Sequence, residues 1–83
     1  MPYEKIAKAR QKTVGAKQTM KAVEKGRVKF LYIAKDADRH VTEPIIKICE
    51  SKNIPFAQVD SMKNLGKACG IDVRCAIAAI IEE

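Results

Sequence analysis

The stretch "VKFLYIA", from Val28 to Ala34, decides the fold. It is a nearly continuous apolar run rich in β-branched and aromatic residues. A strand with one face in water alternates polar and apolar residues, whereas a strand covered on both faces reads as an unbroken apolar run. The stretch therefore predicts a central strand with helices packed on both sides of its sheet.

Helical and extended patterns alternate along the rest of the chain. We expect helices over Pro2–Lys12, Gly15–Lys25, Val41–Lys52 and Met62–Cys69, a short extended link at Thr13–Val14, and further strands over Ile54–Val59 and Cys75–Ile81. This alternation predicts an α/β fold, a three-layer α/β/α sandwich with a small mixed sheet. A chain of 83 residues is one domain, residues 1–83.

Three polar or special residues mark the expected helix ends. Pro44 is tolerated only in a first turn, which places the start of its helix near Thr42 as the N-cap. Ser61 is expected to cap the next helix, and Gly70 to close it.

The helix expected at Gly15–Lys25 has a clear apolar stripe. Ala16, Met20 and Val23 recur at i, i+4 and i+7, so we expect them to face the core. Gly26 then supplies the left-handed residue that ends the helix.

Composition argues against several classes of protein. No apolar run approaches the roughly 18 residues of a membrane span, and the charged N-terminus does not resemble a signal peptide. Cys49, Cys69 and Cys75 form no C-x-x-C pair, and His40 is the single histidine. We therefore expect a cytoplasmic protein without a metal site or cofactor, whose cysteines are reduced and act as small buried hydrophobes.

The positive charge is concentrated in the first third of the chain. Residues 1–29 hold nine lysines and arginines against two glutamates, whereas residues 30–83 hold seven bases against eight acids. The net charge of +6 thus comes from the first third. Such asymmetry is typical of a face that binds a polyanion, although a solvated lysine-rich surface would give the same count.

The segment "VGAKQTMKAVEKG" begins its helix in an unusual way. Gly15 stands where Ser, Thr, Asp or Asn would be the usual cap, and no acid precedes Glu24. The first turns instead carry Lys17 and Lys21 at the positive end of the helix dipole, a combination that suits an anion. Gln18 adds an amide that donates and accepts at once, which suits a base edge. The set indicates nucleic-acid recognition.

A second unusual segment is "GIDVRC". Ile71 and Val73 flank Asp72 in an expected surface connection, and Arg74 follows. We expect one of the two apolar side chains to pack into the core. Exposed apolar atoms beside Asp72 and Arg74 would form a platform on which a splayed-out base could rest.

Other motifs have simpler explanations. Asp36 and Asp38, with His40 nearby, could hold an acid–base pair, but aspartates before a helix usually bond nearby backbone N–H groups. The glycines form neither a dinucleotide-binding nor a Walker fingerprint. In "LGKACG", the glycine spacing is typical of close helix packing followed by a C-cap. No catalytic residue is expected.

Three segments together resemble a known family. "GAKQTMKAVEKGRVKFLYIAKDAD", "NIPFAQVDSMKNLGKACGIDV" and the apolar "AIAAII" ending are similar to the kink-turn RNA-binding ribosomal proteins L7Ae and L30e. The resemblance runs in one register from about Val14 to Ile81, and the family fold is an α/β/α sandwich.

Family members bind a kink-turn, an RNA duplex bent sharply at a bulge followed by tandem sheared G·A pairs. The resemblance implies that the helix start contacts the two guanines and that the hydrophobic loop holds the flipped-out bulge nucleotide. Archaeal members carry Asn-Glu at positions 17 and 18 and Glu at position 72, whereas Lys-Gln also occurs in the L30e branch. The implied RNA-binding residues are Gly15, Lys17, Gln18, Lys21, Ile71, Asp72 and Val73, to which the platform adds Arg74.

We therefore expect a non-enzymatic RNA-binding protein that stabilises kink-turns. Its partner would be RNA, ribosomal RNA included, within a ribosome or another ribonucleoprotein, and we expect a monomer. A protein–protein adaptor with an incidental basic face is the main alternative. A small enzyme that uses Asp36 and Asp38 is a weaker one.

Overall fold

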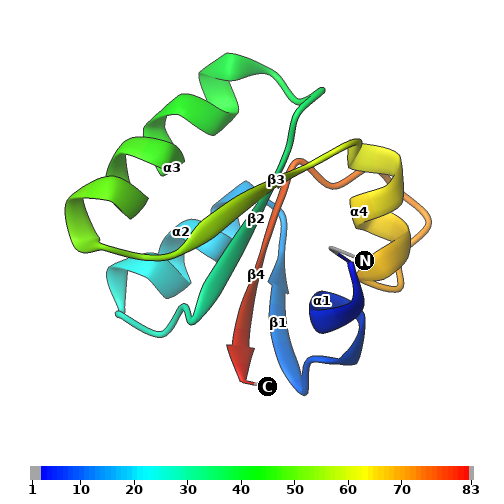
Figure 1. Ribbon diagram of the computed structural model, residues 1–83, viewed down its shortest axis with the longest axis horizontal. Helices are drawn as coiled ribbons and strands as arrows, with labels where there is room; N and C mark the ends of the chain where they lie inside the picture. The colour runs from blue at the N-terminus through cyan, green and yellow to red at the C-terminus, as the bar shows by residue number, and fades with distance from the viewer. Residues whose placement is uncertain (1–2, 83) are drawn as a thin grey trace.

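The computed structural model describes residues 3–82, which form a mixed sheet between two pairs of helices (Figure 1). The elements in chain order are α1 (Glu4–Lys8), β1 (Gln11–Val14), α2 (Ala16–Glu24), β2 (Phe30–Ala34), α3 (Arg39–Lys52), β3 (Phe56–Val59), α4 (Met62–Ala68) and β4 (Ile77–Glu82). The α/β/α architecture expected from the alternating patterns is confirmed.

The sheet has the strand order β1-β4-β2-β3. β4 pairs antiparallel with both β1 and β2, and β2 pairs parallel with β3. Leu31 stands at the middle of this arrangement, opposite Ala79 of β4 on one side and Phe56 of β3 on the other. The expected central strand is thus β2, and the sheet is mixed, as expected.

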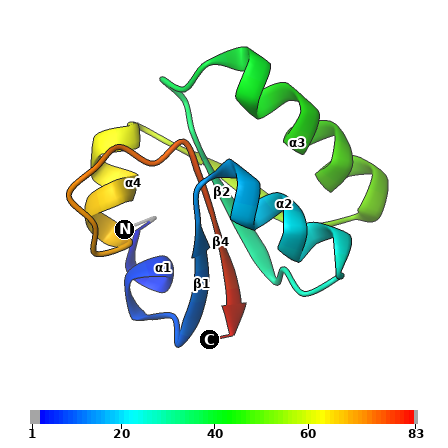
Figure 2. The same ribbon diagram turned by 180° about the vertical axis from the view of Figure 1, so that it is seen from behind.

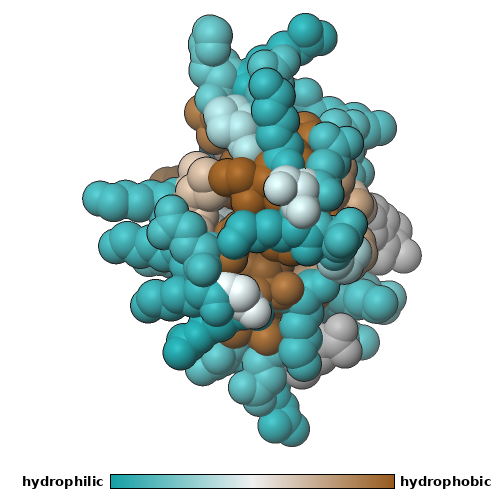
Figure 3. All heavy atoms as spheres, turned by 90° about the vertical axis from the view of Figure 1, so that its left-hand side faces the viewer, coloured by the Kyte–Doolittle hydropathy of each residue, from teal (hydrophilic) through white to brown (hydrophobic). Residues whose placement is uncertain are grey.

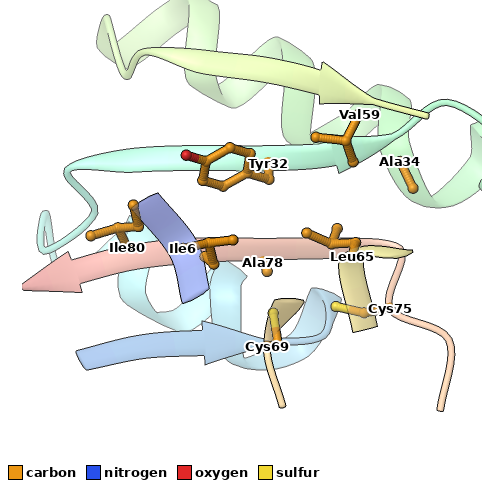
Figure 4. Packing of buried hydrophobic residues seen from close by; sticks show 9 residues of the cluster. All are labelled: Ile6, Tyr32, Ala34, Val59, Leu65, Cys69, Cys75, Ala78 and Ile80. Carbon is orange, nitrogen blue, oxygen red and sulfur yellow. The ribbon is translucent and has the colours of Figure 1, made fainter. Parts of the chain in front are cut away.

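Helices cover both faces of the sheet, which explains the unbroken apolar run. α2 and α3 lie on one face, and α1 and α4 lie on the other (Figures 1 and 2). Along β2 and β4 successive side chains alternate between the faces, so two separate apolar layers form. The layer under α2 and α3 holds Val23, Leu31, Ile33, Ile45, Cys49, Ile77 and Ala79. The layer under α1 and α4 holds Ile6, Tyr32, Ala34, Val59, Leu65, Cys69, Cys75, Ala78 and Ile80 (Figure 4).

The outer surface of α2 and α3 is mainly hydrophilic. Charged and polar side chains project around it, with hydrophobic atoms visible between them (Figure 3). Among the helices of residues 3–82, none has the length and apolar character needed to cross a bilayer.

The expectation for the N-terminal segment was wrong in part. The helix ends at Lys8 rather than Lys12, because Ala9 is extended (φ −62°, ψ 137°). Gln11–Val14 is an edge strand on β4 and not a simple link. Lys12 contributes to this change. Its Nζ donates to the carbonyls of Ile6 (3.1 Å) and Ala7 (3.4 Å), and so it caps the C-terminal, negative end of α1. Pro2, the expected first residue of the helix, lies outside the described residues.

The start of α3 also differs from the expectation. Asp38, and not Thr42, is the N-cap, and its carboxylate accepts from the His40 N–H at 2.8 Å. Thr42 is buried inside the helix, and Pro44 lies in the second turn. The proline consequently removes one bond of the helical ladder, the one that the His40 carbonyl would accept.

The other expected helix ends are confirmed. The Ser61 side chain accepts from the Asn64 N–H at 3.1 Å, so it caps α4. Gly70, after α4, and Gly26, after α2, have positive φ values of 81° and 68°.

The buried face of α2 is wider than the predicted stripe. Val23 is fully buried, whereas Ala16 and Met20 are only partly buried. Thr19 is also fully buried, and its hydroxyl lies 2.8 Å from the hydroxyl of Thr13 on β1. Because Thr19 is polar, the apolar pattern of the sequence does not reveal that it is buried. Its hydrogen bond with Thr13 nevertheless joins α2 to the edge strand.

Candidate nucleic-acid interface

The N-terminus of α2 offers free backbone donors. Gly15 is the N-cap and carries no side-chain acceptor, and its carbonyl receives the N–H of Thr19 at 3.1 Å. The N–H groups of residues 16–18 therefore precede the helical ladder. Within residues 3–82 they have no acceptor, and the first turn holds no acid. This helix end can bind a negative group directly.

Gly15 is needed for its backbone and not for packing. Its φ of 94° with ψ of 156° belongs to a region that side-chain-bearing residues essentially avoid. A Cβ at this position would meet no protein atom within 4 Å. The space in front of the helix end is thus open to a ligand.

The predicted side chains around this end are exposed. Lys17, Gln18 and Lys21 all project into solvent. None of them has a hydrogen-bond or ion-pair partner in the part of the chain that the structure describes. Their charge and their amide are therefore available to a partner.

The loop between α4 and β4 exposes one apolar side chain. Val73 is 67% exposed, the larger of the two exposed large hydrophobics among the described residues. Ile71 is half-buried and packs against the α1/α4 layer, so one of the two apolar residues tucks into the core, as expected. A surface hollow of about 310 Å³ lies here, lined by Lys63, Lys67, Ile71, Asp72, Val73 and Arg74.

Lys63 and Lys67 were missed by the sequence reasoning. They line the same hollow as Val73, from one face of α4. Their i, i+4 spacing in the helix just before the loop was the available signal. The hollow that Val73 lines therefore also carries their positive charge.

The helix end and the loop meet at one end of the sheet. Because β1 and β4 are antiparallel, the end of β1 and the start of β4 are neighbours. The Gly15 N–H donates to the Ile77 carbonyl at 2.8 Å, which joins the start of α2 to the chain leaving the loop (Figure 2).

Two buried thiols lie beneath this junction. Cys69 ends α4, Cys75 precedes β4, and their sulfur atoms face one another in Figure 4. A hydrogen bond from Cys69 lowers the pKa of the Cys75 thiol below its ordinary value, and the Gly15 N–H acts in the same direction. The same thiol pair and burial raise the pKa of Cys69. In its neutral form the Cys75 thiol donates to the Ile77 carbonyl at 3.0 Å.

Gly66 sets how closely α4 approaches the loop. A Cβ on this buried glycine would overlap the Val73 carbonyl oxygen and lie 3.3 Å from its carbonyl carbon. The Ile71 N–H also donates to the Gly66 carbonyl at 3.0 Å. The backbone that presents Val73 therefore rests directly on α4, as the close packing predicted for "LGKACG" requires.

The aspartates considered for catalysis are helix caps. The Asp36 carboxylate accepts from the Met62 N–H at 2.8 Å and so caps α4 from across the sheet end. Asp38 caps α3 through His40, whose side chain is exposed. In the span from residue 3 to residue 82, no three His, Cys, Asp or Glu side chains are grouped as metal ligands.

The cationic start of α2 and the exposed apolar loop lie together at one end of the sheet of an α/β/α sandwich. The protein is thus a small α/β/α domain with a candidate binding site at that end. Residues 3–83 match the family described as "Ribosomal protein L7Ae/L30e/S12e/Gadd45 family". The chain belongs to this family.

Named relatives support the assignment over the full length. An RNA-binding protein of Halalkalibacterium halodurans is 48% identical over 80 residues, which cover 96% of this chain and 98% of the relative. An RNA-binding protein of Bacillus pumilus is 44% identical over 81 residues, covering 98% and 99%. The fold is also similar to that of the Giardia lamblia 15.5kD RNA binding protein, with a TM-score of 0.85, 28% identity, and coverage of 98% of this chain and 68% of the other.

Replacing Gly66 with alanine tests the contact between α4 and the loop. Alanine in a helix usually stabilises relative to glycine by about 0.5–1 kcal/mol. Here we expect the overlap with the Val73 carbonyl to lower the free energy of unfolding by about 1–3 kcal/mol, as overpacking does. Urea denaturation of Gly66→Ala beside the parent protein measures this difference, and a rise in stability would contradict the contact.

Proposed function

We propose that the protein is a non-catalytic RNA-binding protein that recognises and stabilises kink-turn RNA. The observation that carries the proposal is the uncapped, cationic start of α2 beside the exposed Val73 loop, at one end of the sheet. Relatives of nearly the same length are named RNA-binding proteins, which supports the ligand class.

In this proposal the start of α2 reads the two guanines of the sheared G·A pairs. The free N–H groups of residues 16–18 and the Gln18 amide offer donors and an acceptor to base edges. Lys17 and Lys21 neutralise nearby phosphates. Because Gly15 adds no side chain in front of the helix end, the RNA can approach the backbone closely.

The loop in turn holds the nucleotide expelled at the bulge. Val73 offers an apolar surface to the base, and the Arg74 guanidinium can stack on it or bind its phosphate. Asp72 can accept a hydrogen bond from the edge of the base. Ile71 supports the loop from the core side.

The protein acts on the RNA by selecting its bent form. A sharp kink brings phosphates together and unstacks bases, which costs a few kcal/mol by analogy with kinked DNA. A protein that binds only the kinked form shifts the population toward it by the difference in affinity. No bond is made or broken, so the function needs no catalytic group.

We place this binding in the cytoplasm, on ribosomal RNA or another ribonucleoprotein RNA, with the protein as a monomer. The charge distribution supports a large polyanion as partner, since nine of the sixteen lysines and arginines lie in residues 1–29.

Gln18→Ala tests whether the helix end reads the G·A pairs. We expect its affinity for a kink-turn RNA to fall about tenfold or more, since one good amide–base contact is worth about 1–3 kcal/mol. A duplex with both G·A pairs changed to Watson–Crick pairs should show no such loss in a fluorescence titration. Gln58→Ala, which removes an exposed amide from β3, is the matched control. Equal losses on both RNAs would contradict the role of Gln18.

Val73→Asp tests whether the loop holds the bulge nucleotide. A carboxylate there would remove the apolar surface and repel the nearby phosphate, so we expect the base to be released. The fluorescence of 2-aminopurine placed at the bulge reports its environment. Val41→Asp on α3 is the control, because Val41 is also exposed, at 39%. Identical fluorescence with Val73→Asp and the parent protein would remove the loop from the site.

A further inference from the structure

Cys69 and Cys75 lie at the two ends of the loop that carries Val73, with five residues between them. Both are buried in the layer under α1 and α4, and their sulfur atoms point toward one another (Figure 4). The Cys69 thiol donates a hydrogen bond to the Cys75 sulfur. Cys49 belongs to the other apolar layer, on the opposite face of the sheet. The first two cysteines can therefore pair with one another, and neither can pair with Cys49.

Backbone contacts hold this thiol pair together. The Cys75 N–H donates to the carbonyl of Met62, in the first turn of α4, at 3.1 Å. A Cβ on Gly66, one turn later, would lie 3.7 Å from the Cys75 nitrogen. The chain that enters β4 thus runs directly against the helix that Cys69 ends. Such close backbones bring two cysteine side chains within reach of a disulfide.

The thiol pair contacts both parts of the candidate RNA site. The Ile77 carbonyl accepts from the Cys75 thiol at 3.0 Å and from the Gly15 N–H, at the start of α2, at 2.8 Å. On the other side, the Val73 carbonyl rests on Gly66. A chemical change at the two sulfur atoms is therefore passed directly to the loop and to the helix end.

Cys75 is the thiol with the greater chemical reactivity. The hydrogen bond from Cys69 and the Gly15 N–H lower the pKa of Cys75, which favours the thiolate, the nucleophilic form. Burial instead raises the pKa of Cys49. Cys75 is 2% exposed and Cys69 8%, so the oxidant must be small and must enter where the loop of residues 70–74 opens locally.

We propose that Cys69 and Cys75 form an oxidative modification site, at which a peroxide produces a reversible intramolecular disulfide that weakens RNA binding at the α4–β4 loop. The Cys75 thiolate attacks one peroxide oxygen, the O–O bond breaks, and hydroxide leaves as the Cys75 sulfenic acid forms. The Cys69 sulfur then attacks the Cys75 sulfur, and the S–O bond breaks. The hydroxyl group leaves with the Cys69 proton as water. In sum, two thiols and one peroxide give one disulfide and two waters, and a dithiol reverses the oxidation.

The disulfide rests on the thiol pair, whereas its effect on RNA rests on the kink-turn function proposed above. The new bond draws the two sulfur atoms together and removes the proton that Cys75 donates to the Ile77 carbonyl. The Val73 carbonyl already touches Gly66, so the loop has no room to approach α4 at that point. Residues 70–74 must therefore change their conformation, which moves Val73 away from the extruded base.

Peroxide treatment of the parent protein, followed by alkylation of the remaining thiols and mass spectrometry, tests the disulfide. Trypsin cleaves the denatured protein after Arg74, between the two cysteines, so a disulfide leaves peptide 68–74 joined to the peptide that begins at Cys75. We expect a monomer lighter by two hydrogens, with alkylated thiols reduced from three to one. Cys49→Ala is the matched control and should form the same joined peptides, whereas Cys69→Ala should not.

Titration of kink-turn RNA with the reduced and the oxidised parent protein tests the effect on binding. We expect the oxidised form to bind about tenfold more weakly, as for the loss of one base contact. Dithiothreitol should restore the affinity, and peroxide should leave the affinity of Cys69→Ala unchanged. Thermal unfolding of both forms checks that the oxidised protein remains folded.

Several outcomes would overturn the proposal. Three alkylated thiols after peroxide, a disulfide-linked dimer, or addition of oxygen in place of the loss of hydrogen would reject the modification site. A disulfide with equal or tighter RNA binding would reject its effect on the loop. If the reduced parent protein does not prefer the kink-turn over its Watson–Crick control, the kink-turn proposal fails, and the joined peptides still decide whether the disulfide forms.

Discussion

The structure depends on the pairing of β4 with both β1 and β2. This pairing places an apolar strand at the centre of the sheet, where Ile77 through Ile80 are all buried. It also brings the end of β1 to the start of β4, so that the Gly15 N–H reaches the Ile77 carbonyl. The start of α2 and the α4–β4 loop consequently share one end of the sheet, although they are far apart in the sequence.

The candidate site lacks features that usually stabilise a helix end and a surface loop in a free domain. A stable helix end carries a side-chain cap and acids, as α3 does with Asp38, whereas α2 has a glycine followed by lysines. Val73 is likewise left in solvent on a loop held against Gly66. Both features forgo stabilisation that a cap or a buried side chain would give. Under the proposed function, a polyanion with an extruded base would contact both.

The sequence predicted the layers, the central strand, most helix ends and the packing of one apolar loop residue into the core, because these follow from local pattern and cap chemistry. Only the structure shows that this residue is Ile71. The sequence did not predict strand β1, because β1 forms by pairing with β4 and because Lys12 caps the C-terminal end of α1. The expected bonding of the loop aspartates to nearby backbone N–H groups is confirmed, but the N-cap of α3 is Asp38 and not Thr42, because Pro44 lies in the second turn and not in the first. The sequence also predicted which residues lie at the helix end and in the loop. It did not predict that Lys63 and Lys67 line the same hollow as Val73, because this depends on how α4 packs against the loop.

The most direct measurement is a binding titration of the parent protein against a kink-turn RNA and against the same duplex with both G·A pairs made Watson–Crick, at two salt concentrations. The account predicts a large preference for the kink-turn that weakens at high salt but survives, because base contacts add to phosphate contacts. Equal binding to the two RNAs, lost together at high salt, would contradict it and leave only a basic surface.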